Sequence, residues 1–168
     1  PEVDRFLRSP DAHIRAAVIH GKDRSGVTER ALTLYKAITP DLNDPFNVTF
    51  LTEADIDGDA VKLEEALTAL SMIGGRRLVR IRLSDGKAGV DKAIAAALTI
   101  HAEGGYNPDA MLVIEAGALG RESALRKAAE KSPGAVGIAC YEDEVGDVAR
   151  MTREALSADK VGLTGDAL

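Results

Sequence analysis

The sequence AAVIHGKDRSGVT, residues 16–28, is an apolar run followed by two glycines and a threonine. The apolar part predicts a short buried strand, and apolar residues at helical spacing follow from Thr28. Gly21 and Gly26 have the spacing of a phosphate-binding loop, and Thr28 stands where its metal-binding hydroxyl would be. Val27 replaces the lysine that bridges the phosphates in such loops. We therefore expect a degenerate loop without a cofactor, although an ordinary strand-to-helix turn would also explain the two glycines.

Strand-like and helix-like segments alternate along the rest of the chain. Apolar runs and period-two alternation predict strands at 16–20, 46–51, 77–83, 110–115 and 135–141. Helical spacing of apolar residues predicts helices at 1–8, 28–38, 60–71, 90–102, 121–131 and 145–156. This alternation predicts an α/β fold, with a five-stranded, mainly parallel sheet and helices on both faces. One domain is predicted at 1–158, with 159–168 as the start of another.

The composition is typical of a globular domain, at 45% hydrophobic and 29% charged residues. Aromatic residues make up 4% and tryptophan is absent, so the core is expected to be aliphatic. A net charge of −6 argues against a stand-alone DNA-binding module, which would normally be basic. No apolar run reaches about 18 residues, so we expect no membrane contact. With no signal peptide in the sequence, the expected location is cytoplasmic.

Few side chains have the type and spacing of a catalytic or metal site. Glu115 is at the end of the fourth predicted strand and could hold a metal, but a capping or surface role fits it better. His13, His20 and His101 lie in separate elements, without a cysteine or carboxylate at ligand spacing. His20 is beside the glycines, where it could line a pocket or act as a base. Cys140, the single cysteine, is expected to be a small buried hydrophobe. The sequence therefore predicts no catalytic residue and no metal site.

The segment ALTALSMIGGRR, residues 66–77, has helical periodicity as far as Leu70 and then a glycine pair. Met72 and Ile73 stand at the expected helix end, just before these glycines. There they could project as apolar anchors for a partner protein. They could also fold back as the last core contacts of the helix, and periodicity alone favours this second interpretation.

Taken together, these segments resemble the N-terminal domain of the delta subunit of the bacterial DNA polymerase III clamp loader. The resemblance rests on the lysine-less glycine loop and on residues 70–77, 112–117, 123–127 and 136–141. It implies an AAA+ fold without ATP hydrolysis, and binding to the sliding clamp (the beta subunit), which is opened for loading onto primed DNA. It also implies no catalysis by the chain itself, within a DNA-directed DNA polymerase holoenzyme that acts as a nucleotidyltransferase.

By the same resemblance, Leu70, Ser71, Met72 and Ile73 are the clamp-binding residues. Met72 and Ile73 correspond to the wedge that enters a pocket of the clamp, Leu70 to a supporting contact and Ser71 to a spacer. The family often has Leu-Phe at the wedge, so here no aromatic ring fills the pocket. The resemblance further implies that residues 159–168 begin a truncated helical lid domain. Other loader subunits (gamma or tau, and delta prime) would assemble through missing C-terminal domains, and DNA would be a partner only indirectly.

Two other functions fit parts of the sequence. Lys22, next to Gly21, could replace the missing lysine in a divergent P-loop nucleotide hydrolase. Alternatively, a small-molecule-binding α/β domain could have its pocket near His20 and Glu115.

A local basic cluster could dock the clamp rim or DNA, but a solvated strand face near a sheet edge explains it better. This cluster consists of Arg76, Arg77, Arg80 and Arg82.

Overall fold

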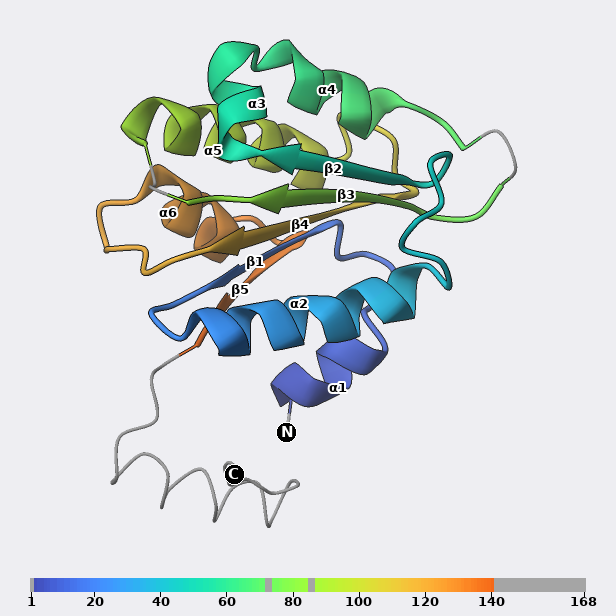
Figure 1. Ribbon diagram of the computed structural model, residues 1–168, viewed down its shortest axis with the longest axis horizontal. Coiled ribbons are helices and arrows are strands. Elements are labelled where there is room, and N and C mark those ends of the chain that lie inside the picture. The colour runs from blue at the N-terminus through green and yellow to red at the C-terminus, as the bar shows by residue number, and fades with distance from the viewer. Residues whose placement is uncertain (1, 72–73, 85–86, 141–168) are drawn as a thin grey trace.

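A parallel five-stranded sheet forms the centre of the computed structural model, which describes residues 2–71, 74–84 and 87–140. The strand order is β2-β3-β4-β1-β5, and every pairing is parallel (Figure 1). The strands are β1 (Ala16–His20), β2 (Val48–Thr52), β3 (Arg77–Arg82), β4 (Ala110–Ala116) and β5 (Ala135–Ala139). The helices are α1 (Glu2–Arg8), α2 (Arg24–Ile38), α3 (Glu53–Gly58), α4 (Val61–Thr68), α5 (Ala88–Ala102) and α6 (Ala124–Lys131). The predicted α/β fold is confirmed.

Helices cover both faces of the sheet. Figure 1 shows α1 and α2 on one face, and α3, α4, α5 and α6 on the other. Each face has its own aliphatic core, with Leu34 of α2 central to the first and Leu67 of α4 central to the second. The central strands β1 and β4 are buried along their whole length, as continuous apolar strands in a parallel sheet require. Among the described residues, no helix is long and apolar enough to cross a membrane.

Several element boundaries differ from those predicted. Helix α2 begins at Arg24, earlier than the predicted Thr28, because the Asp23 carboxylate caps it by accepting the backbone N–H of Gly26 at 3.0 Å. Helix α4 ends at Thr68 and not at Ser71. Its N-cap is Ala60, although Asp59 Oδ1 accepts the N–H of Val61. The predicted helix at 145–156 and the predicted domain boundary at 158 lie outside the described residues.

The prediction that the arginine-bearing strand lies near an edge with a solvated face is right only in part. Strand β3 lies between β4 and β2, and β2 is one of the two edge strands. Arg82 is exposed, with 46% of its side chain in solvent, but Arg80 is only half-exposed. Arg77 is buried and donates to Phe46 O at 2.6 Å and to Thr49 Oγ1 at 3.0 Å. Arg80 packs its guanidinium over the ring of Tyr35, at 4.4 Å from the centroid. These two arginines therefore hold the edge strand and α2 to the sheet.

Candidate functional site

The segment between α4 and β3, which we call the α4–β3 loop (residues 69–76), contains the predicted contact residues. It lies at the amino ends of the strands, opposite the glycine loop that follows β1 (Figure 1). Helix α4 stops before Leu70, which is 73% exposed and does not pack as the last apolar residue of a helix. Met72 and Ile73 lie outside the described residues, so their wedge role stays a prediction.

The α4–β3 loop is fixed to the body of the domain near both ends. Asn107 donates from Nδ2 to Ala69 O at 2.9 Å and from its backbone N–H to Leu67 O at 3.1 Å. On the β3 side, the N–H of Arg77 donates to Asp109 O at 3.0 Å. Ser71 Oγ donates to Gly74 O at 2.8 Å and so closes the loop on itself. These bonds hold Leu70 between two anchored ends while leaving it in solvent.

Two glycines turn the α4–β3 loop back toward the sheet. Gly74 and Gly75 have φ of +83° and +86°, a conformation that glycine adopts without the steric cost that other residues meet. No atom lies within 4 Å of where a Cβ would stand on either glycine, so the surroundings are open. Next to them, burial lowers the pKa of Arg76, and the charge of Asp109 opposes that shift. The loop is thus shaped by backbone conformation at an open surface.

The glycine loop at the other end of the strands is closed. Gly21 packs so tightly that a Cβ there would overlap the backbone carbonyl of Cys140, and its own N–H donates to Gly117 O at 3.2 Å. The Asp23 carboxylate lies at the amino end of α2, where a phosphate would otherwise bind. Val27 is buried within α2, and Thr28 lies one residue further along the same helix. The predicted loop residues from Gly26 onward are therefore helical and do not form an open cradle.

Arg24 lies across the carboxyl ends of the strands. Its Nη2 donates to Leu83 O, just after β3, at 2.9 Å. A Cβ on Gly117, just after β4, would come within 3.1 Å of its Nη1. Ligands of parallel α/β sheets commonly bind at these strand ends. Here the side chain of Arg24 lies across the ends of β3 and β4, where a ligand would otherwise bind.

Glu115 has neither the capping nor the surface role that we predicted. Its carboxylate is buried, accepts a hydrogen bond from the Tyr35 hydroxyl, and lies 3.5 Å from Arg82 Nε. Burial, and then the bond to Glu115, raise the pKa of Tyr35 well above its usual value. Within the described part of the chain, no cluster of three or more His, Cys, Asp or Glu side chains could hold a metal ion. Glu115 is thus part of a buried hydrogen-bond network with Tyr35, which is 80 positions away in the sequence. No local pattern in the sequence indicates this pairing.

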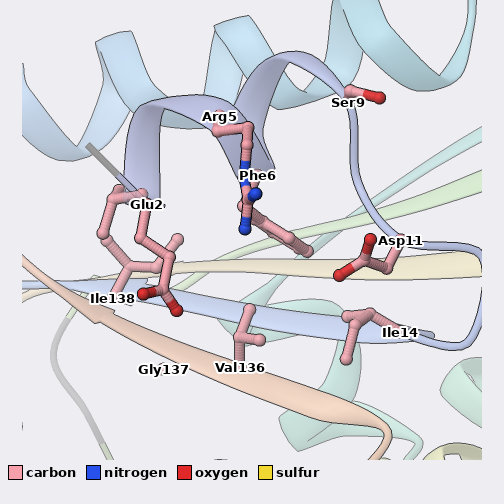
Figure 2. A pocket seen from close by; sticks show the side chains of 10 residues that line it. Glu2, Arg5, Phe6, Ser9, Asp11, Ile14, Val136, Gly137 and Ile138 are labelled. Carbon is pink, nitrogen blue, oxygen red and sulfur yellow. The ribbon is translucent and has the colours of Figure 1, made fainter.

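The predicted pocket near His20 and Glu115 has no counterpart in the cavity shown in Figure 2. That cavity, of about 360 Å³, lies between α1 and β5 and is lined by neither residue. Its walls include Phe6, Ile14 and Ile138, with Glu2 and Arg5 from α1. His20 is buried beside the strand ends, and burial lowers the pKa of its imidazole. Cys140 is buried as predicted, and burial raises the pKa of its thiol.

Sequence reasoning missed Asn107, the residue that fixes the start of the α4–β3 loop. The Asn107–Asp109 stretch is recognisable as a turn because it contains Pro108. Its hydrogen bond to Ala69 spans 38 positions, and nothing local in the sequence reveals it.

Comparison with known proteins gave likenesses among solved structures. No family model matches the sequence, and no curated protein matches it. The DNA clamp loader delta protein of Bacillus subtilis superposes with a TM-score of 0.66 at 15% identity, over 95% of this chain and 48% of that chain. A DNA polymerase III gamma subunit-related protein from Thermotoga maritima superposes with a TM-score of 0.54 at 14% identity, over 95% of this chain and 52% of that one.

The chain therefore spans about half the length of each of these two proteins. At such low identities the likeness concerns the fold, and at that level it agrees with the resemblance found in the sequence. Over the portions that superpose, this chain shares its fold with a clamp-loader delta protein and with a gamma subunit-related protein.

Proposed function

We propose that this domain acts in DNA replication as the clamp-binding part of a clamp-loader delta subunit. It binds the bacterial sliding clamp and favours its open form, without hydrolysing ATP. The observation that carries the proposal is the α4–β3 loop, which presents Leu70 at 73% exposure between hydrogen-bonded ends. The shared fold with a clamp-loader delta protein supports it. Assembly with other loader subunits would use parts of the protein beyond this chain.

The mechanism has no covalent step. Met72 and Ile73 would enter an apolar pocket of the clamp as anchor residues, with Leu70 as a supporting contact. The anchored ends of the loop lower the conformational entropy that binding must remove. If these residues contact the open clamp better than the closed clamp, binding shifts the ring toward the open state by that difference in affinity.

The closed glycine loop supports a role without nucleotide hydrolysis. The chain has Val27 at the lysine position, and the Asp23 carboxylate occupies the amino end of α2. A carboxylate there repels phosphate, and no lysine bridges the phosphates during transfer. Lys22 is exposed, but it precedes this acidic cap directly.

The test is binding to an immobilised bacterial sliding clamp by surface plasmon resonance. We expect the Met72→Ala and Ile73→Ala double variant to lose more than about 2 kcal/mol of binding free energy, and Leu70→Ala to lose less. The matched control is Val61→Ala, which truncates a side chain that is 55% exposed on α4, and it should bind like the wild type. Unchanged binding by a folded double variant would rule out the site.

An ATP titration of the same protein tests the proposal that the domain does not hydrolyse ATP. We expect no saturable binding and no hydrolysis. Saturable binding, with hydrolysis that disappears in Lys22→Ala, would instead indicate a divergent nucleotide hydrolase.

A further inference from the structure

An aromatic and basic surface lies on the β2 edge of the sheet and contains none of the α4–β3 loop residues that we propose for clamp binding. We call Phe50, Arg80 and Arg82 the Phe50 platform. Phe50 is on the edge strand β2 and is 45% exposed. The guanidinium carbons of Arg80 and Arg82 lie 5.0 and 5.4 Å from the centre of its ring. Phe50 is a large exposed ring with two guanidinium groups over it, and it belongs to neither of the two cores.

Buried neighbouring side chains hold the two guanidinium groups in place. Phe50 is directly opposite Arg80 in the strand pairing, and Thr52 is opposite Arg82. Arg80 also lies over the ring of Tyr35, and Arg82 pairs with the buried carboxylate of Glu115. The platform is therefore preorganised, so a ligand would not have to order these long side chains.

The platform is locally positive in a chain whose net charge is −6. Arg82 faces the carboxylate of Glu115, and the Tyr35 hydroxyl bonded to that carboxylate is held protonated by a raised pKa. The nearest acidic groups beyond β2 are Glu53, which is buried directly after Thr52, and Asp55, whose carboxylate accepts the N–H of Thr52 in the capping box of α3. An anionic ligand is thus attracted beside Phe50 and repelled beyond Thr52.

We propose that the Phe50 platform binds single-stranded nucleic acid, with an unpaired base stacked on Phe50 and the flanking phosphates at Arg80 and Arg82. Binding without sequence preference combines aromatic faces, which stack on any base, with positive charge that follows the backbone. Both components are present here within one pair of strands. A duplex keeps its bases stacked on each other, so the platform selects single strands. The proposal does not depend on clamp binding.

Tryptophan fluorescence offers a direct test, because the chain has no tryptophan of its own. In the full chain, Phe50→Trp should be quenched by an oligo(dT) of about 12 nucleotides at low salt, and the quenching should be reversed by added salt. The matched control is Phe46→Trp. Phe46 is 59% exposed just before the same strand, and Arg77 contacts its backbone oxygen and not its ring. Equal quenching of both variants, or of neither, overturns the proposal.

Binding of a labelled oligo(dT), followed by fluorescence anisotropy, separates stacking from charge alone. Phe50→Leu keeps an apolar side chain but removes the ring, and we expect roughly tenfold weaker binding, while Phe50→Tyr should bind like the wild type. Duplex DNA should bind far more weakly. Equal affinity of wild type and Phe50→Leu, or a polyglutamate peptide binding as well as the oligonucleotide, would point instead to an acidic protein partner and would refute the proposal. Unchanged clamp binding by Phe50→Leu would show that the two surfaces act separately.

Discussion

At the carboxyl ends of β1 and β4 the polar groups are paired with one another, whereas at the amino end of β3 the α4–β3 loop leaves an apolar side chain in solvent. Asp23 caps α2, Arg24 binds Leu83 O, and Tyr35 binds Glu115. Leu70, in contrast, is 73% exposed. Parallel sheets usually place function at the carboxyl ends of their strands. Here that end is closed by the protein's own side chains, and the open surface has moved to the opposite end.

Glycine substitutions should show this difference most strongly. A Cβ on Gly21 would overlap the Cys140 carbonyl, which is backbone and cannot rotate away, whereas a Cβ on Gly74 has open space and suffers only from its positive φ. We expect Gly21→Ala to lower the free energy of unfolding by roughly 3–5 kcal/mol and Gly74→Ala by about 1 kcal/mol. Urea denaturation measures both. Similar losses would mean that the glycine loop is not tightly closed.

Replacing a leucine by alanine before and after the end of α4 should sharpen the comparison between the closed core and the open α4–β3 loop. Leu67 is fully buried in the last turn of α4, and Leu70 lies two residues beyond the helix. We expect Leu67→Ala to cost about 3 kcal/mol of unfolding free energy and Leu70→Ala less than about 0.5 kcal/mol. A large thermal destabilisation by Leu70→Ala would show that this side chain packs on the core, as helical periodicity alone had suggested.

Tyr35→Phe should have a smaller effect at neutral pH than Gly21→Ala or Leu67→Ala, and one that depends on pH. Removing the hydroxyl leaves the buried Glu115 carboxylate without this donor, at a cost of about 1 kcal/mol of unfolding free energy. The pKa of Tyr35 is raised in the folded protein, so its contribution is complete below about pH 10, where the unfolded phenol ionises, and is lost as the pH rises above that.

The difference between wild type and Tyr35→Phe should therefore shrink in urea titrations above about pH 10. Tyr106→Phe is the comparison, because the pKa of Tyr106 is also raised, by burial and by Glu64, but without a hydrogen bond to a carboxylate among its causes; the difference between wild type and Tyr106→Phe should change less with pH. A difference for Tyr35→Phe that stays constant with pH would contradict the assignment of the network.

The sequence predicted the strands and their parallel arrangement well, because each strand has its own apolar run. The continuous run Ala110–Ala116 needs no information from elsewhere to be recognised as a fully buried strand. Helix ends were less predictable. At α2 the spacing of Gly21 and Gly26 suggested an open loop, although Asp23 is an ordinary capping residue that starts the helix at once.

The candidate sites were less predictable, because they depend on contacts between residues far apart in the chain. The exposure of Leu70 follows from the early end of α4, where Asn107 holds the Ala69 carbonyl across 38 positions. Arg80 looked like a solvated residue until Tyr35, from α2, was found beneath its guanidinium. Neither relation has a periodicity or spacing from which it could be deduced.

The strand order also has a consequence for how the domain is made on the ribosome. β1 pairs only with β4 and β5, so Ala16 meets Leu112 and Ala135, which are synthesised about a hundred residues later. Until then the first strand, apolar apart from His20, has no hydrogen-bonding partner, and contacts of such long sequence separation form slowly. The nascent chain therefore exposes an aggregation-prone segment until β4 has been made, and the five-stranded sheet is complete only when β5 emerges.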